Sequence, residues 1–469
     1  MTPLWQLSAT DQAAGIRDGS FTSAAVVESV LERVAQKNPE LNAIVDPMEE
    51  QALLASEKAD NAVASGRKLG LLHGVPVTIK VNVDTKGRPT TNGMEAFKDV
   101  IAPDNSPIVQ NLLNAGAIIV GRTNTPEMSM RLTTDNPLYG LTRNPWNLEM
   151  SPGGSSGGAA ASAASGFGAI HHGNDIAGSL RYPATACGVS TLKPGLGRVP
   201  AYLPSAKAER GMLAQLMSVQ GAICREIKDV RLATQVLIGH DPRDPWHVPM
   251  PFSQPGSGLS KIGFSREAHG YPIHDGILAN LDRAASILEE AGYQVEEIET
   301  PPIAEAAKAW LQVTNFEMKK TLEPVFNEHG SEIIKQIFGC YYKLEDMVDA
   351  EGYLFGIAER TRMVREWNLL LADYPLILTP FLMRPGYASD FDETFEGVKD
   401  LFDSSIYSYG VNYLGMPAGV VPVDLVEGLP SGIQLIGQKW REDLILDAME
   451  VIENATGVMT RKLWDREAD

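Results

Sequence analysis

Residues 153–158 read Gly-Gly-Ser-Ser-Gly-Gly, and the residues that follow, 159–164, read Ala-Ala-Ala-Ser-Ala-Ala. Glycine adopts backbone angles that other residues avoid, and it lets a second molecule approach the main chain closely. A flexible Gly/Ser linker is the other interpretation of such a stretch. The alanine-rich run favours an ordered loop that leads into a tightly packed helix, because alanine is the best helix former.

Two further segments supply polar side chains with catalytic potential. Lys80 ends the apolar stretch Val-Pro-Val-Thr-Ile-Lys at 75–80, and Ser179 ends Asp-Ile-Ala-Gly-Ser at 175–179. A serine hydroxyl is a weak nucleophile unless a nearby base removes its proton. Burial among apolar neighbours lowers the pKa of a lysine and turns it into a neutral base. Lys80, Ser155 and Ser179 can therefore supply a base, a proton relay and a nucleophile; a structural ion pair is the alternative role for Lys80.

The order and spacing of these motifs resemble the amidase signature family of serine hydrolases. In that family the first serine of Gly-Gly-Ser-Ser-Gly-Gly and the serine that ends Asp-Ile-Gly-Gly-Ser lie 24 positions apart, and here 179 minus 155 is 24. The resemblance is closest over residues 74–200. Further matches extend it along nearly the whole chain: Asn-Pro-Trp at 144–146, Arg-Tyr-Pro-Ala at 181–184, Leu-Lys-Pro at 192–194, Asn-Tyr-Leu-Gly-Met-Pro at 412–417 and Gly-Leu-Pro-Ser-Gly-Ile-Gln-Leu-Ile-Gly at 428–437.

The resemblance implies a Ser-cisSer-Lys triad. Ser179 would be the acylated nucleophile, Ser155 would connect it to Lys80, and the peptide bond before Ser155 would be cis. Neutral Lys80 would take the proton of Ser155 as Ser155 takes that of Ser179, and the reverse transfer would protonate the leaving amine. The resemblance implies neither a metal ion nor an organic cofactor.

An oxyanion hole made of main-chain N–H groups is also implied by the resemblance. The expected donors belong to four consecutive residues: Ile176, Ala177, Gly178 and Ser179. The family has glycine where this chain has Ala177. Alanine disfavours a positive φ angle at this position, but its methyl group leaves the N–H in place as a donor. Asn174 stands where many relatives have threonine or serine. We expect Asp175 and Ser156 to support the site without contacting substrate, with a free surface carboxylate as the alternative for Asp175.

Four apolar residues are candidates for the substrate pocket: Met128, Met130, Trp310 and Phe316. In the family the pocket walls come from variable loops, for which residues 128–132, 202–217, 310–316 and 381–387 are the candidates here. Aromatic residues in the helical stretch 303–371 are equally typical of a protein core. Both interpretations stay open for Trp310 and Phe316.

Several other chemistries are disfavoured. His171 and His172 precede Ser179, but no Gly-x-Ser-x-Gly elbow with a later Asp and His accompanies them, so we expect packed or solvent-facing histidines. The glycines match neither of the common nucleotide-binding patterns. The cysteines lack Cys-x-x-Cys spacing, which indicates buried thiols rather than a zinc site or a disulfide: Cys187, Cys224 and Cys340.

Alternating helix and strand patterns predict an α/β fold, with one large domain over residues 1–469 and a central mixed β-sheet covered by helices on both faces. A proline-initiated helix at 106–116 precedes an apolar strand, and 261–298 reads as strand, helix, strand. Within this domain we expect a signature core at 74–200. We expect substrate-pocket insertions and outer helices at 201–400.

The net charge of −19 disfavours nucleic acid and anionic membranes as partners. The first residues, Met-Thr-Pro-Leu-Trp-Gln-Leu-Ser, lack the basic and apolar regions of a signal peptide. No run of about 18 apolar residues occurs in the sequence. We therefore expect a cytoplasmic protein whose partner is a small-molecule amide substrate, and a homodimer is left open as its assembly.

The resemblance favours an amide-bond hydrolase that converts a carboxamide to a carboxylate and ammonia or an amine. The alternative is the glutaminase subunit of a tRNA-dependent amidotransferase, which shares the motifs and needs partner chains. Thr-Pro-Glu-Met-Ser-Met at 125–130 and Ser-Leu-Arg-Tyr-Pro at 179–183 differ from the patterns of that subunit. A catalytically inactive scaffold is disfavoured because all three triad positions are filled.

Overall fold

The computed structural model describes residues 2–252 and 261–468. One mixed sheet of eleven strands runs through them in the order β1-β3-β2-β4-β6-β5-β10-β11-β9-β7-β8. The strands are β1 (Ile44–Pro47), β2 (Pro76–Lys80), β3 (Ile118–Thr123), β4 (Ile170–Asp175), β5 (Ser190–Lys193), β6 (Val219–Cys224), β7 (Lys261–Phe264), β8 (Gln294–Glu297), β9 (Leu376–Pro380), β10 (Ala418–Val426) and β11 (Leu429–Gly437). The single α/β domain with a central mixed sheet is therefore confirmed.

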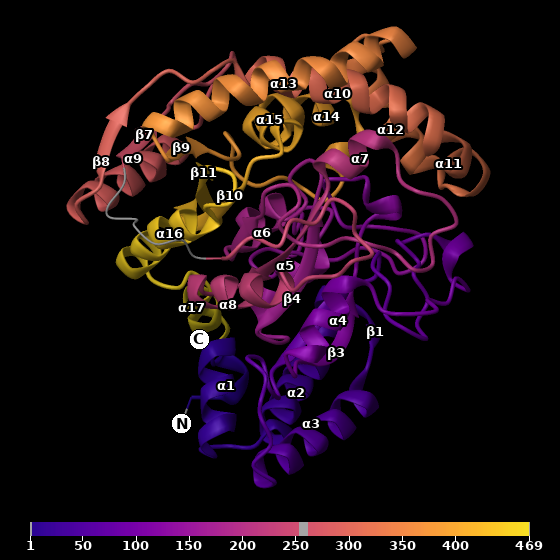
Figure 1. Cartoon of the computed structure of the whole chain (residues 1–469), viewed down its shortest axis with the longest axis vertical. Coiled ribbons are helices and arrows are strands. Elements are labelled where there is room, and N and C mark those ends of the chain that lie inside the picture. Colours follow the sequence, from indigo (N-terminus) through magenta and orange to yellow (C-terminus); the bar gives the residue numbers. More distant parts are fainter. Residues whose placement is uncertain (1, 253–260, 469) are drawn as a thin grey trace.

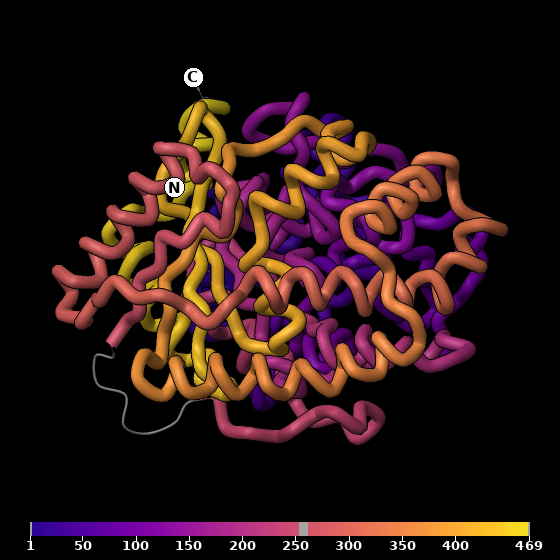
Figure 2. The backbone as a smooth tube through the Cα atoms, turned by 90° about the horizontal axis from the view of Figure 1, so that it is seen from above, coloured from indigo at the N-terminus to yellow at the C-terminus, as the bar shows by residue number. Residues whose placement is uncertain are grey.

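Helices cover both faces of this sheet (Figure 1). They are α1 (Ala9–Asp18), α2 (Ser23–Leu41), α3 (Glu49–Ala64), α4 (Pro107–Asn114), α5 (Gly157–Ser165), α6 (Arg181–Cys187), α7 (Met212–Met217), α8 (Ile227–Leu237), α9 (Asp275–Glu290), α10 (Ile303–Thr321), α11 (Glu323–His329), α12 (Glu332–Leu344), α13 (Ala350–Asp373), α14 (Phe395–Asp403), α15 (Ile406–Leu414), α16 (Glu442–Thr456) and α17 (Thr460–Ala468). In Figure 1, α10 and α13 lie at the edge opposite to α1, α2 and α3, and Figure 2 looks down on the α10 and α13 side.

Consecutive side chains of a strand point to opposite sides of the sheet. Helices cover both sides, so the central strands are buried on both faces. In β9, Leu376 and Leu378 join the hydrophobic core formed with α8, α9 and α16. Ile377, between them, joins the core formed with α10 and α15. This pattern explains why the strand sequence is continuously apolar rather than alternating.

The predicted helix and strand at 106–120 are present as α4 and β3, and β7, α9 and β8 form the predicted strand-helix-strand unit with the two strands parallel. The range 201–400 contributes more than pocket segments and outer helices. It also supplies β6, β7, β8 and β9 to the central sheet. Residues 74–200 and 201–400 thus contribute strands to the same sheet.

Helix α5 is buried along its whole length, and its side chains are only those of glycine, alanine and serine. Such small residues let the helix lie directly against neighbouring main chain. A Cβ atom on Gly158 would lie 2.5 Å from the main-chain nitrogen of Asn124, so the contact requires glycine. Ser155 and Ser156, which precede α5, lie beside the end of β2, where both hydroxyls are within hydrogen-bond distance of Lys80.

No helix among residues 2–252 and 261–468 is both long enough and apolar enough to cross a membrane.

Candidate active site

Lys80 ends β2 on the side of the sheet that faces the Gly/Ser segment. Val77 and Ile79 point to the opposite side and pack into the hydrophobic core there. The strand period of two residues therefore directs Thr78 and Lys80 towards α5. The Lys80 side chain is fully buried, and this burial lowers its pKa well below the ordinary value, although the nearby Asp175 carboxylate opposes the shift.

The amino group of Lys80 lies within hydrogen-bond distance of three neutral oxygens. Nζ lies 2.7 Å from Ser155 Oγ, 3.1 Å from Ser156 Oγ and 2.9 Å from Asn174 Oδ1. Lys80 is thus held by hydrogen bonds rather than by an ion pair, which disfavours the structural ion-pair interpretation. A buried lysine with only neutral partners is suited to act as a base.

The two serine segments meet beside Lys80. The peptide bond between Gly154 and Ser155 is cis. The N–H of Ser156 donates a hydrogen bond of 3.2 Å to the carbonyl oxygen of Ser179. Ser155 and Ser179 are almost completely buried, and both line the same cavity. Lys80, Ser155 and Ser179 are therefore gathered in one place, as the family resemblance implies.

The turn that carries Ser179 is organised by the carboxylate of Asp175, which is buried and is not a surface group. It accepts hydrogen bonds from the N–H groups of Gly178 at 2.7 Å and Leu180 at 3.2 Å. The guanidinium of Arg181 donates to it at 3.0 and 3.1 Å. Burial alone would raise the pKa of Asp175, but Arg181 lowers it to about 2.

These contacts correct the expected oxyanion hole at one position. The N–H of Gly178 donates to Asp175 and is not free to bind a substrate oxygen. Within the described residues, the N–H groups of Ile176, Ala177 and Ser179 have no protein acceptor. Ala177 does not have a positive φ angle, which explains why alanine is accommodated, whereas Gly178 has φ 115°. The available donors are therefore three rather than four.

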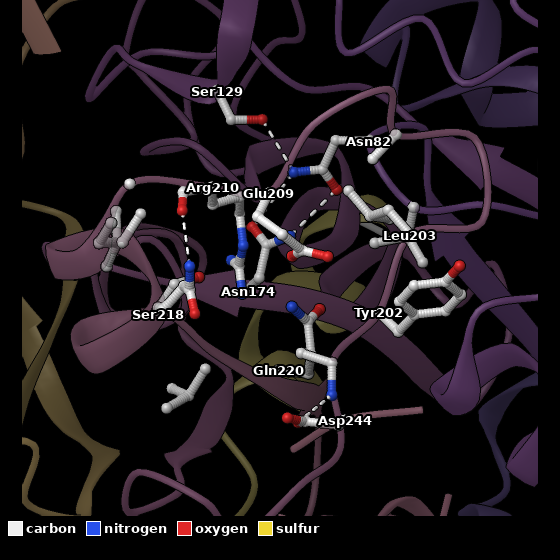
Figure 3. Close-up of a pocket in the computed structure, with 18 of the residues that line it drawn as sticks. Asn82, Ser129, Asn174, Tyr202, Leu203, Glu209, Arg210, Ser218, Gln220 and Asp244 are labelled. Atoms are coloured by element: carbon white, nitrogen blue, oxygen red, sulfur yellow. Dashed lines mark hydrogen bonds between the residues drawn. The ribbon is translucent and has the colours of Figure 1, made fainter. Parts of the chain in front are cut away.

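A cavity of about 930 Å³ lies beside the two serines. Three of the four apolar candidates line it: Met128, Met130 and Trp310. Phe316 does not, because it lies six residues after Trp310, about 240° further around α10. Its ring lies against that of Tyr353, with centroids 5.1 Å apart. Of the candidate loops, 202–217 contributes to the lining, and Figure 3 shows Glu209 and Arg210 from it, whereas residues 381–387 do not line the cavity.

The histidines before Ser179 are engaged elsewhere. His171 Nδ1 lies 2.9 Å from Thr78 Oγ1, and His172 Nε2 lies 2.9 Å from Gln220 Oε1. Burial lowers the pKa of each histidine to about 3, so both rings are neutral. Neither has a hydrogen bond to Ser155 or Ser179 within the part of the chain described. A Ser-His-Asp triad is not formed.

A chain of polar groups that the sequence interpretation missed continues outward from Lys80. Figure 3 shows its members Asn174, Asn82 and Ser129. Asn174 Nδ2 donates to Asn82 Oδ1 at 3.1 Å, and Asn82 Nδ2 donates to Ser129 Oγ at 3.0 Å. The three residues come from three separate segments. The available signal was Asn82, a polar residue only two positions after Lys80, in the turn that follows β2.

Comparison with known proteins decides the family. The family model described as Amidase matches residues 25–446. The chain belongs to the amidase family. Over 467 residues it is 45% identical to an indoleacetamide hydrolase of Bradyrhizobium diazoefficiens, a match that covers 99% of this chain and 89% of that protein.

Two further similarities concern other members. The amidase is 32% identical to one of the subunits of the glutamyl-tRNA(Gln) amidotransferase of Cyanothece sp., over 92% of this chain and 94% of that protein. Its fold matches the crystal structure of a bacterial aryl acylamidase of the amidase signature family with a TM-score of 0.86, 26% identity and 99% coverage of both chains. This amidase is therefore an enzyme that hydrolyses amide C–N bonds.

Proposed function

We propose that this amidase hydrolyses the primary amide of an arylacetamide such as indoleacetamide, with Ser179 as nucleophile, Ser155 as proton relay and Lys80 as base. The observation that carries the proposal is the 2.7 Å hydrogen bond between Lys80 Nζ and Ser155 Oγ, beside a cavity that both serines line. The choice of substrate is supported by the 45% identity to an indoleacetamide hydrolase over 99% of this chain.

The proposed reaction proceeds through an acyl-enzyme. Neutral Lys80 accepts a proton from Ser155 while Ser155 accepts one from Ser179, and Ser179 Oγ attacks the amide carbon. The main-chain N–H groups of Ile176, Ala177 and Ser179 are available to stabilise the negative oxygen that forms. Reversal of the relay protonates the amine nitrogen, and ammonia leaves as the C–N bond breaks. Water then attacks the ester through the same relay and releases the carboxylate.

The lining of the cavity supports an apolar aromatic acyl group. Met128, Ile176 and Trp310 line the same cavity as the two serines, with side chains that suit an aromatic ring. The leaving group needs little space when it is ammonia. A primary amide with an aromatic acyl part therefore fits the site.

We place the enzyme in the cytoplasm and expect no nucleic acid in its reaction. The described cysteines support a reducing compartment, since all three are buried and free: Cys187, Cys224 and Cys340. The net charge of −19 supports the second expectation. A homodimer stays a prediction.

The test uses the purified chain without any partner. We expect equal amounts of ammonia and indoleacetate from indoleacetamide and no release of ammonia from glutamine. A fluorophosphonate should add its mass to Ser179, and the Ser179→Ala variant should be inactive but folded. Labelling of Ser155 would overturn the assignment of the nucleophile. Glutamine hydrolysis that requires added partner chains would favour the role in an amidotransferase.

A further inference from the structure

Two side chains from outside the signature core hold the carbonyl groups of the loop before Ser179. Trp310 Nε1, on α10, donates a hydrogen bond of 3.1 Å to the Ile176 carbonyl. Ser408 Oγ, on α15, donates one of 2.8 Å to the Ala177 carbonyl. Both donors are buried, and they stand 134 and 231 residues away from their acceptors. The loop is thus held from elements distant in the sequence.

These contacts determine where the N–H groups of the loop point. In a trans peptide the C=O and the following N–H point in opposite directions. Fixing the Ile176 carbonyl towards Trp310 turns the Ala177 N–H away from α10. Fixing the Ala177 carbonyl towards Ser408 turns the Gly178 N–H away from α15, where it donates to Asp175. The Trp310 contact therefore sets the orientation of one available donor, the Ala177 N–H. The Ser408 contact fixes the next peptide of the same loop, whose N–H is already held by Asp175.

Trp310 is itself held firmly. Its ring lies against Tyr409 of α15 with centroids 4.9 Å apart, and Tyr409 in turn lies 4.7 Å from Phe402. Only 4% of Trp310 is exposed, and that part lines the cavity beside Ile176. One indole therefore contacts both the oxyanion loop and the space for the acyl group.

We propose that Trp310 and Ser408 are positioning residues that align the oxyanion loop, and that Trp310 couples recognition of an aromatic acyl group to that alignment. This inference rests on the proposed function. A purely structural role in the core would change the stability of the fold without a selective change in kcat. The two donors act on adjacent peptide groups, so each can be removed separately.

The first experiment removes the donors. Ser408→Ala deletes one hydroxyl, and Trp310→Phe keeps a ring but deletes the N–H. Displacing an oxyanion donor costs up to about 10²–10³ in kcat, so we expect Trp310→Phe, which frees the peptide that carries the Ala177 N–H, to lower kcat by about tenfold or more with little change in KM. Ser408→Ala frees the next peptide, whose N–H is also held by Asp175, so we expect a smaller but measurable fall in kcat. The pH dependence of kcat/KM should not move, because Lys80 is untouched. Thermal unfolding and titration of active sites with a fluorophosphonate measure the folded fraction.

A matched control is Trp464→Phe, since Trp464 Nε1 also donates to a carbonyl, that of Ala164, at 2.8 Å. We expect its kcat to stay within about twofold of the parent. If Ser408→Ala and Trp310→Phe, both folded, also keep the parent kcat, the positioning role is overturned. A fall in kcat explained wholly by loss of folded enzyme would likewise overturn it.

The second experiment tests the coupling to the acyl group. Ser408→Ala should lower kcat/KM for indoleacetamide and for propionamide by the same factor. Trp310→Leu should lower it more for indoleacetamide, because the ring contact is lost as well. An equal loss for both amides in Trp310→Leu would overturn the coupling. If the parent prefers another amide, the proposed substrate fails, but the same comparison on that amide still tests the positioning.

Discussion

Lys80 Nζ lies 2.9 Å from Asn174 Oδ1, and this amide stands directly before Asp175, the residue that organises the nucleophile turn. The proposed base and the proposed nucleophile are therefore connected through adjacent residues at the end of β4. Asn174 is neutral, so it orients the amino group without stabilising the ammonium as a carboxylate would. Burial is the main cause of the lowered pKa of Lys80, and Asp175 in this segment opposes the shift.

Replacing Lys80 by methionine should abolish the base while keeping the volume of the side chain. We expect the acylation rate to fall by at least about 10²–10⁴. Because burial lowers the pKa of Lys80, the parent rate should rise with pH through that pKa and then level off. Lys80→Met should lose this acidic limb. Acylation measured before steady state, as a function of pH, checks the prediction.

The control is a second buried lysine. Burial lowers the pKa of Lys193 to about 7, and its Nζ donates to the Met416 carbonyl at 2.6 Å. Lys193→Met should keep the acidic limb of the profile. If the limb disappears in Lys193→Met and remains in Lys80→Met, Lys80 is not the base.

Asn174→Asp should move the acidic limb to higher pH. A carboxylate beside Lys80 Nζ favours the ammonium, and an opposite charge within hydrogen-bond distance shifts a pKa by about 1–3 pH units. The Asp175 carboxylate already raises the pKa of Lys80 against the effect of burial. Asn82→Asp, one hydrogen bond further out, should give a smaller shift. Identical pH profiles of kcat/KM for the parent and both variants would contradict the role of Asn174.

Much of this site follows from the sequence because its motifs are local. The local sequence predicts the strand that ends at Lys80 and the ordered glycine-rich loop before α5. The family resemblance predicts that these two segments lie side by side. Contacts that depend on distant elements were not predictable. The direction of Phe316 on α10 and the hydrogen bond from Ser408 to Ala177 depend on how helices pack, which no local pattern encodes.

The hydrogen bond from the N–H of Gly178 to Asp175 is a contact between residues close in sequence that the sequence also does not predict. The sequence predicts that Asp175 supports the site, but it does not say which N–H groups the carboxylate binds. Arg181 decides this, because its guanidinium fixes the carboxylate over the turn. Which of the expected oxyanion donors stay free therefore depends on a side-chain orientation rather than on a motif.

Asp175→Asn should strongly destabilise the fold. The variant leaves the guanidinium of Arg181 buried without its partner, which costs about 3–5 kcal/mol in the free energy of unfolding. Urea unfolding at pH 7 measures the loss. Asp424→Asn, which breaks exposed ion pairs with Arg283 and Lys462, should cost no more than about 1 kcal/mol.

The same variant has a defined pH dependence. The folded pKa of Asp175 is about 2, below the ordinary value of 3.8, so the carboxylate stabilises the folded state above pH 3.8. That stabilisation is lost as the pH falls through 3.8 towards 2. The difference in stability between parent and Asp175→Asn should therefore shrink in this window. A difference that stays constant from about pH 7 down to about pH 3 would contradict the lowered pKa.

Ala177 offers the last prediction, because its N–H is an available donor and its carbonyl is held by Ser408. Its φ angle is not positive, so glycine is not required, and Ala177→Gly should stay active. Ala177→Val places a branched side chain beside the loop, where Ala177 already packs against the core formed with α10 and α15. We expect kcat to fall, by up to about 10²–10³ if the N–H is displaced. Both variants are measured on one amide, with active sites titrated; a valine variant with the parent kcat would show that residue 177 does not shape the oxyanion hole.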